Sequence, residues 1–301
     1  MSKKTKLLYG TDPELVSVYE NRGALYTLPP YFFRKYLKVP ASSDPNHPIF
    51  LEENGWKFHE DGAAFEMSVK PSFNPRELFN TIQECKETAE KKIISKFPEH
   101  CHPVLRFLPT VGFDVDRWKN EGDDFRMSTR FGCDPDMDAF NIEANCVVVD
   151  ASLHPERYCG GHIHFSGSKF FKSEPILAIK SLALTAGCAS VLYSDVNELE
   201  RRRTFLYGKP GKWRLQTYGK NPFGKDYEVG IEYRTISDTW CKSWEIAEKI
   251  FNWATIGILE LLEKGLIKEL LPELSDIATT AIIEQDRELA SQVLDTIYAR
   301  V

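Results

Sequence analysis

Alternation of apolar and polar residues predicts two central strands of this chain. In residues 65–70 apolar side chains occupy every second position, which is the period of a strand with one buried face. This pattern places Glu66 on the face opposite the core. Residues 161–165 alternate in the same way, so that His162 and His164 share one face.

Further strands are predicted from shorter segments. Residues 229–236 form one of them, with Glu232 and Arg234 on the same side of the strand because they lie two residues apart. Apolar runs predict additional strands at residues 6–9, 15–19, 104–107 and 146–149.

Three parts of the sequence have the pattern of helices. Asn74 can cap a helix that has Pro75 in its first position and extends to about residue 97. Its apolar stripe consists of Leu78, Ile82, Cys85, Ala89, Ile93 and Phe97. Residues 175–193 read as a well-buried helix, followed by a polar helix over 195–203, and the chain is helical from about residue 242 to 300.

Two segments lack such periodicity. Residues 24–55 predict a long surface loop, and residues 208–224 a mobile basic segment with many glycines. Strands and helices do not alternate steadily, so we expect one α+β domain with a mainly antiparallel sheet over residues 1–301. Its C-terminal helices are expected to begin at about residue 242.

Composition narrows the classes of partner. The chain has 301 residues and a formal net charge of −6, which argues against an extended nucleic-acid surface. It has no N-terminal secretion signal and no uncharged stretch of about 18 apolar residues, so we expect no membrane insertion. The seven cysteines contain no Cys-x-x-Cys pair and are interpreted as reduced thiols of a cytoplasmic protein.

Acidic side chains stand beside two of the predicted strands. Asp12 and Glu14 are two residues apart, a spacing that puts both carboxylates on one side of an extended chain, although Asp-Pro also commonly starts a turn. Asp61 and small residues precede Glu66 and would let a ligand approach it, while a lone glutamate on an outer face is often only solvated. Such oxygen donors suit Mg2+.

Two predicted strands, one with two histidines and one with a Glu-x-Arg motif, indicate more specific chemistry. His162 and His164 follow two glycines, which would leave room for a bulky anionic ligand beside two imidazoles; a polar strand with one hydrogen-bonded histidine is the alternative. Glu232 beside Arg234 suits a metal-bound triphosphate, and a surface salt bridge is the alternative there.

A basic segment precedes the last strand. Residues 201–214 contain six arginines and lysines with interspersed glycines, and could form a flexible lid over phosphates or a merely solvated loop. The spacing from Gly208 to Lys212 is not that of a P-loop.

Six short motifs, taken in order, resemble those of the phage-type carboxylate-amine ligases (the type-two amidoligase family), a remote branch of the glutamine synthetase and glutamate-cysteine ligase superfamily. The motifs are Gly10-x-Asp12-x-Glu14, Asp61 to Glu66, Gly132-Cys133-Asp134-Pro135-Asp136, Arg157-Tyr158-Cys159-Gly160-Gly161-His162-Ile163-His164, Tyr207-Gly208-Lys209-Pro210-Gly211 and Glu232-Tyr233-Arg234. The resemblance extends from about residue 8 to 240. It implies a glutamine-synthetase-like curved antiparallel sheet, with helices packed on its outer face.

The resemblance also implies roles for individual residues. Metal binding is expected of Glu14, Glu66, Glu232, His162 and Asp12, although an aspartate at position 12 departs from the Gly-x-Glu-x-Glu pattern of the glutamate-cysteine ligase branch. ATP binding is expected of His162, Arg214, Arg234, Lys209 and Arg157, and substrate binding of Arg130 and Asp134. Arg234, Asp61 and His164 are the catalytic candidates. Asp61 is the candidate base that deprotonates the amine because of its position beside a glycine, and a turn residue is the alternative there.

The expected activity is ATP-dependent amide-bond formation through an acyl phosphate, with Mg2+, or alternatively Mn2+, as the metal. Its substrates would be a small-molecule or peptide carboxylate and an amine, and the protein would be phage-encoded and work in the host cytoplasm, with a homo-oligomer left open. Two alternatives are a phosphotransferase of the guanidino-kinase-like type and a catalytically inactive nucleotide-binding protein.

Overall fold

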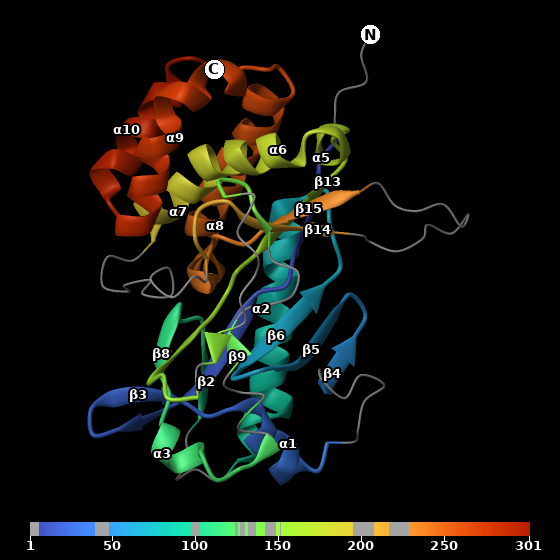
Figure 1. The fold of residues 1–301 in the computed structure, drawn as a ribbon. Helices are drawn as coiled ribbons and strands as arrows, with labels where there is room; N and C mark the ends of the chain where they lie inside the picture. Colours follow the sequence, from blue (N-terminus) through green and yellow to red (C-terminus); the bar gives the residue numbers. More distant parts are fainter. Residues whose placement is uncertain are drawn as a thin grey trace.

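The structure, a computed structural model, describes residues 6–39, 48–97, 103–123, 126, 130–131, 137–141, 149–150, 152–194, 208–216 and 229–301. Within these residues the fold is α+β, with mostly antiparallel sheets and helices outside them (Figure 1). The α+β class predicted from the sequence is therefore confirmed.

The first sheet has five strands and is antiparallel throughout. Its order is β1 (Leu8–Thr11), β13 (Ile163–Ser166), β15 (Gly230–Tyr233), β14 (Lys212–Gln216) and β10 (Met137–Asp138). The register sets His164 opposite Glu232 and Glu232 opposite Arg214, so that these side chains form one row across three strands. One face of the sheet thus carries a line of ionisable groups.

The second sheet has eight strands, and only the pair β3–β8 is parallel among those described. Its order is β12 (Glu156–Tyr158), β8 (Thr110–Gly112), β3 (Ala24–Thr27), β2 (Glu14–Asn21), β6 (Ala64–Val69), β5 (Trp56–Asp61) and β4 (Ile49–Glu53), with β7 (Val104–Arg106) also paired to β2. A separate pair is formed by β9 (Arg130–Phe131) and β11 (Val149–Asp150).

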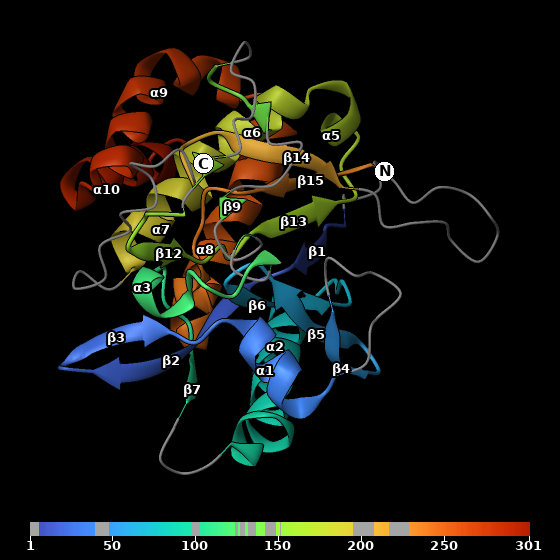
Figure 2. The same cartoon turned by 60° about the horizontal axis from the view of Figure 1, so that its bottom comes forward.

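The helices cover the faces that carry the apolar side chains. They are α1 (Pro30–Leu37), α2 (Pro75–Lys92), α3 (Val115–Trp118), α5 (Phe170–Ser173), α6 (Pro175–Leu182), α7 (Cys188–Tyr193), α8 (Trp244–Ile256), α9 (Ile267–Glu284) and α10 (Arg287–Tyr298). Helix α2 runs along β5 and β6, whereas α6 packs on β15 and α7 to α10 gather with α6 in one helical group (Figures 1 and 2). Tyr9 of β1, for example, packs edge-on against Phe251 of α8.

Helix α2 forms as its sequence predicts. The Asn74 side chain accepts a hydrogen bond from the Arg76 backbone N–H, and Pro75 occupies the first turn, where its missing N–H has no cost. The predicted apolar stripe from Leu78 to Phe97 is buried. This helix therefore covers the second sheet, as expected.

The prediction of a long surface loop over residues 24–55 is wrong. This segment contains β3, α1 and β4, and the Phe33 ring of α1 packs edge-on against Phe65 of β6 at 5.4 Å between centroids. The segment is rich in proline and aromatic residues, whose burial depends on contacts with distant strands. Local periodicity could not reveal those contacts.

The basic segment over 208–224 also differs from its prediction. Lys212–Gln216 is strand β14, which is paired on both sides, so this part is no mobile lid. Residues 201–207 of the predicted lid, residues 217–224 of the predicted mobile segment and the predicted helix over 195–203 lie outside the described residues, as do residues 146–148 of one predicted strand.

The helical segment Pro175–Tyr193 is long and apolar enough, by length and composition, to cross a membrane, with a mean hydropathy of 1.7. It is formed by α6, a π-helical turn over Ala183–Gly187 and α7. In the fold, 72% of its most apolar window is buried. That burial is the pattern of a core helix.

Candidate metal centre

The chain passes from the first sheet to the second between Asp12 and Glu14. Asp12 directly follows β1 of the first sheet, whereas Glu14 is the first residue of β2 in the second sheet. The two carboxylates therefore join different groups of side chains. The mixed cluster consists of Asp12, His162 and Glu232, and the oxygen cluster of Glu14, Asp61 and Glu66.

In the mixed cluster, one histidine nitrogen faces two carboxylates. The Nδ1 atom of His162 lies 3.5 Å from Asp12 Oδ1 and 3.4 Å from Glu232 Oε1. Two ligand atoms that are each about 2.1 Å from one ion lie roughly 3.0–3.4 Å apart at the angles that metal ions prefer. The spacing of the mixed cluster is thus close to that of a metal site.

Two arginines hold Glu232. Arg214 donates from Nε to Glu232 Oε2, and Arg234 donates from Nη1 to Glu232 Oε1. Both guanidinium groups lie on the side of the mixed cluster, since Arg214 is directly opposite Glu232 and Arg234 follows it by two residues, just after β15. The cluster is therefore bordered by fixed positive charge.

Gln216 and His164 complete this network. Gln216 Nε2 lies 3.1 Å from Glu232 Oε2 and 3.3 Å from His164 Nδ1, and His164 Nε2 lies 3.1 Å from Asp12 Oδ1. Gln216 was not among the candidates from the sequence. Its position in β14, two residues beyond Arg214, would have been the only signal for it.

The oxygen cluster is built on a cross-strand pair. Glu14 and Glu66 are directly opposite each other on β2 and β6, and Asp61 ends the neighbouring strand β5. Ligand oxygens of the three residues lie within 4.8 Å of one another. Like charges in directly opposite positions repel, so this arrangement favours a bound cation or a proton.

Backbone contacts fix Glu14 within that cluster. Its carboxylate accepts a hydrogen bond of 2.8 Å from the Gly160 N–H, and its own N–H donates to Gly160 O at 2.9 Å. Burial and the neighbouring Asp61 raise the pKa of Glu14 to about 8, and burial, Asp12 and Asp61 raise that of Glu66 well above its usual range.

Burial and neighbouring charges shift the pKa values of the side chains in and beside the mixed cluster. Burial and the adjacent Arg234 lower the pKa of His162 to about 4, so its imidazole is neutral and has a lone pair to offer a metal. Burial opposes ionisation of Asp12, but the charge and hydrogen bond of His164 outweigh it and hold the Asp12 pKa well below its usual range. For His164, the Asp12 carboxylate outweighs the effect of burial and raises the pKa.

The mixed cluster still has acceptor capacity for a metal. A carboxylate has two lone pairs on each oxygen. Glu232 Oε2 accepts from Arg214 and Gln216, whereas Oε1 accepts from Arg234 and faces His162 Nδ1 with its second lone pair. Two carboxylates and a neutral imidazole form a donor set that suits a divalent cation.

His59, which the sequence patterns did not single out, lies beside the oxygen cluster. His59 Nε2 lies 3.2 Å from Glu66 Oε1 and 2.9 Å from Ser68 Oγ. Its place opposite Glu66 in the β5–β6 register explains the contact. The position of His59 two residues before Asp61 was the feature of the sequence that could have indicated this contact.

Gly161 has a packing role that differs from the predicted space for a ligand. A Cβ atom at this position would lie 2.2 Å from the Ser237 carbonyl oxygen, and the Gly161 N–H donates to Ile236 O. The glycine thus permits two backbones to approach. This approach brings the His162 strand against the segment after β15.

The other predicted site residues are dispersed. Arg157 is buried, donates to the backbone oxygens of His154 and Glu156, and lies over the Phe113 ring at 3.6 Å. Lys209 lies before β14 and accepts a hydrogen bond from Thr235 Oγ1 through its carbonyl oxygen. The backbone of Arg130 is in β9, its side chain lies outside the described atoms, and Asp134 is outside the described residues.

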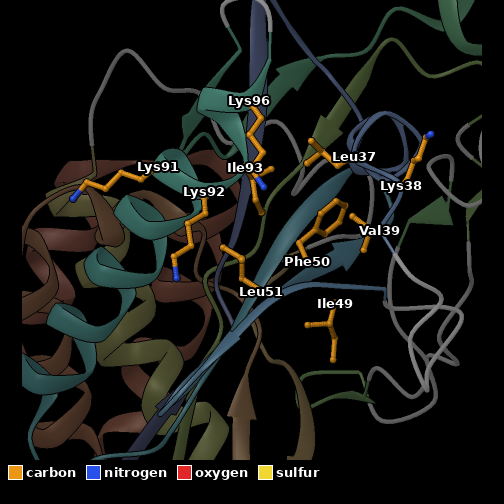
Figure 3. Close-up of a pocket in the computed structure, with 10 residues that line it drawn as sticks. All are labelled: Leu37, Lys38, Val39, Ile49, Phe50, Leu51, Lys91, Lys92, Ile93 and Lys96. Atoms are coloured by element: carbon orange, nitrogen blue, oxygen red, sulfur yellow. The ribbon is translucent and has the colours of Figure 1, made fainter.

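A separate hollow lies between α1, β4 and the end of α2 (Figure 3). It has a volume of about 480 Å3 and a lining of apolar side chains with four lysines. The Lys91 side chain points away from the other lining residues in Figure 3, and Lys92 is paired with Glu53. None of its lining residues belongs to either acidic cluster.

Comparison of the sequence with models of known protein families and with curated proteins finds no match.

Proposed function

We propose that the protein is an ATP- and Mg2+-dependent carboxylate-amine ligase. The observation that carries this proposal is the position of Arg214 and Arg234 on the sheet face that holds Asp12, His162 and Glu232. Metal ligands beside fixed guanidinium groups suit a metal-bound polyphosphate, because the metal neutralises phosphate oxygens and arginine binds them through several N–H groups.

The two clusters provide places for two ions. Asp12, His162 and Glu232 would hold one, and Glu14, Asp61 and Glu66 the other. When bound, such ions would supply positive charge that neutralises the charge developing on phosphate oxygens. Mg2+ fits the all-oxygen cluster best, and the mixed cluster would also accept Mn2+.

The residues of the chain would mainly position and neutralise the reactants. A substrate carboxylate oxygen attacks the γ-phosphorus of ATP, which breaks the bond to the leaving ADP, and an amine nitrogen then displaces inorganic phosphate from the acyl phosphate. Arg234 would stabilise the transferring phosphoryl group. Asp61, at the end of β5, would take the proton that the amine loses.

The finer fold assignment belongs to the same proposal. We infer a glutamine-synthetase-like curved sheet in which β1, β13, β15 and β14 continue through the Asp12–Glu14 junction into β2, β6 and β5. Three observations support it: the antiparallel pairing, helices on the apolar faces, and polar residues of both sheets gathered near one junction. The resemblance of the ordered motifs to the amidoligases adds to them.

Mass spectrometry of a host-cell metabolite extract tests the activity. The purified protein with ATP and Mg2+ should yield a species lighter by one water than its carboxylate and amine precursors combined, together with ADP and phosphate. A Glu232→Gln variant, which loses charge at the mixed cluster, is the inactive control. Matched incubations without ATP identify species already present.

Other outcomes would favour other functions. A stable phosphorylated product without consumption of an amine would favour the phosphotransferase alternative. ATP binding without turnover over a broad panel of carboxylates and amines would favour an inactive nucleotide-binding protein. Either result would overturn the ligase proposal.

A further inference from the structure

His164 of strand β13 and His162, the residue just before this strand, have different surroundings. His162 Nδ1 lies 3.4–3.5 Å from atoms of Asp12, Glu232 and Arg234. These distances are at or near the limit of a hydrogen bond. His164, in contrast, has a closer partner at each ring nitrogen, Asp12 at Nε2 and Gln216 at Nδ1.

Glu232 fixes the orientation of the Gln216 amide. A carboxylate only accepts hydrogen bonds, so the atom of Gln216 that lies 3.1 Å from Glu232 Oε2 must be the NH2 group. The same nitrogen lies 3.3 Å from His164 Nδ1, which must then accept its second hydrogen. With Nδ1 as acceptor, the proton of the neutral ring is on Nε2.

That proton is directed at Asp12. His164 Nε2 lies 3.1 Å from Asp12 Oδ1, a normal hydrogen-bond distance. Glu232 Oε2, the other oxygen near His164 at 3.7 Å, already accepts from Arg214 and Gln216. Neither ring nitrogen of His164 therefore has a lone pair directed at a space between carboxylates.

We propose that His164 is a positioning residue: held by Gln216, it donates from Nε2 to Asp12 and orients this carboxylate toward the ion that Asp12, Glu232 and His162 Nδ1 bind. The inference rests on the metal site of the proposed function. A histidine that donates to a ligating carboxylate typically fixes its direction and supports metal affinity. In this proposal His162 binds the ion directly, whereas His164 orients another ligand of the same ion.

The tautomer of His164 can be measured without a metal. Long-range 1H–15N correlation spectra of the metal-free protein at pH 8 should show His164 with a protonated Nε2 and an unprotonated Nδ1, with the assignment taken from a His164→Gln variant. A Gln216→Glu variant replaces the donor with an acceptor and should move a proton to Nδ1. A wild-type ring with a protonated Nδ1 would overturn the proposal.

The ligand assignment is tested by electron spin echo spectroscopy of bound Mn2+, which detects directly coordinated nitrogen. Spectra are recorded in a His59→Gln background, because His59 lies near Glu66 of the other cluster. The nitrogen signal should persist in His164→Gln and disappear in His162→Gln. The reverse pattern would overturn the proposal.

The positioning role itself is tested by the affinity for Mn2+. Loss of a second-shell partner weakens metal binding about 10- to 100-fold, which is the loss expected for His164→Leu. The amide of His164→Gln can still donate near the position of Nε2, so this variant should recover most of the affinity. His154→Gln, a histidine substitution near β12, is the matched control and should bind Mn2+ as the wild type does.

Failure of this inference can be told apart from failure of the proposed function. Equal affinity of the wild type and His164→Leu, with both proteins folded by circular dichroism, would overturn the positioning role and leave the ligase proposal standing. Mn2+ binding with the expected spectra but no amide product would overturn the ligase proposal and leave the positioning role of His164 standing. Absence of Mn2+ binding by the wild type would overturn both the metal site and the role of His164.

Discussion

Glu14 and Glu66 face each other directly across the antiparallel strands β2 and β6. With Asp61 nearby, this pair concentrates three carboxylates in a buried to half-buried place. Burial and the other carboxylates raise the pKa of both glutamates. The ion-free protein is therefore destabilised when all three groups are ionised, and a bound divalent cation should relieve that repulsion.

Glu66→Gln should stabilise the metal-free protein while reducing its response to Mg2+. Where both glutamates are ionised, removal of one of the two charges should raise Tm by about 2 °C, which corresponds to about 1 kcal/mol in a chain of this size. Thermal unfolding with EDTA and with 10 mM Mg2+ measures both effects. Glu20→Gln, the same substitution at an exposed position of β2, is the control. A variant that keeps the wild-type shift with Mg2+ would contradict the oxygen cluster as a metal site.

The stability of the metal-free protein should fall between about pH 5 and pH 8. The folded-state pKa of Glu14 is raised to about 8, so its contribution to stability is fully present below the unfolded-state value of about 4.3 and is lost as pH rises through 8. The cation competes with this proton. The Tm increase given by Mg2+ should therefore be larger at pH 8 than at pH 6, and an equal increase at both values would refute this explanation.

Arg234→Lys should lower the rate of ATP consumption with little effect on folding. Lysine keeps the charge beside buried Glu232 but cannot donate in the planar geometry of the guanidinium group. Loss of a preorganised contact to transferring phosphate commonly costs about 10²-fold or more in kcat. Coupled ADP-release assays provide the measurement, with Arg76→Lys on the exposed start of α2 as control. Full activity of Arg234→Lys would remove this residue from the proposed role.

Arg157→Met should destabilise the fold and leave nucleotide affinity unchanged. The buried guanidinium donates to two backbone oxygens and stacks on Phe113. Loss of the buried hydrogen bonds should cost about 1–3 kcal/mol. Urea unfolding and ATP titration distinguish this structural role from the ATP-binding role predicted by sequence. A weaker ATP affinity at unchanged stability would support the latter.

Gly161→Ala should disturb the mixed cluster although it changes no ligand. The added Cβ would meet the Ser237 carbonyl at 2.2 Å, so the His162 strand and the chain after β15 must separate. We expect a loss of more than about 2 kcal/mol in unfolding free energy, in the range of overpacked sites, and weaker Mn2+ binding by the folded protein. Wild-type stability would show that the two backbones can adjust.

Local patterns predicted the parts of the fold that depend on neighbours in sequence. The alternation around Glu66 placed it on the outer face of its strand, and Asn74 with Pro75 set the start of α2. The same logic put Glu232 of β15 and Arg234, which directly follows this strand, on one side of the chain, where they are in contact. Each of these predictions needs only a strand or helix period, which the residues carry themselves.

Local patterns failed where distant chain segments decide the outcome. Spacing placed Asp12 and Glu14 on one side of an extended chain, but Pro13 lies between two sheets and the carboxylates join separate clusters. In the aromatic segment before residue 55, the ring of Phe33 packs against the ring of Phe65, which lies in a distant strand. Lys212–Gln216 is a strand because β15 and β10 pair with it.

The sequence by itself determined the α+β class, the main helices and the residue types available for a metal centre. Only the tertiary structure decided which carboxylates come together, that Arg157 donates to the backbone near its own strand, and that Gln216 contacts His164. The reason is physical: a periodic pattern specifies the face of an element, whereas a cluster of ligands depends on the register between strands. That register arises from pairing of β1, β13, β15 and β14, whose residues are up to about two hundred positions apart in the chain.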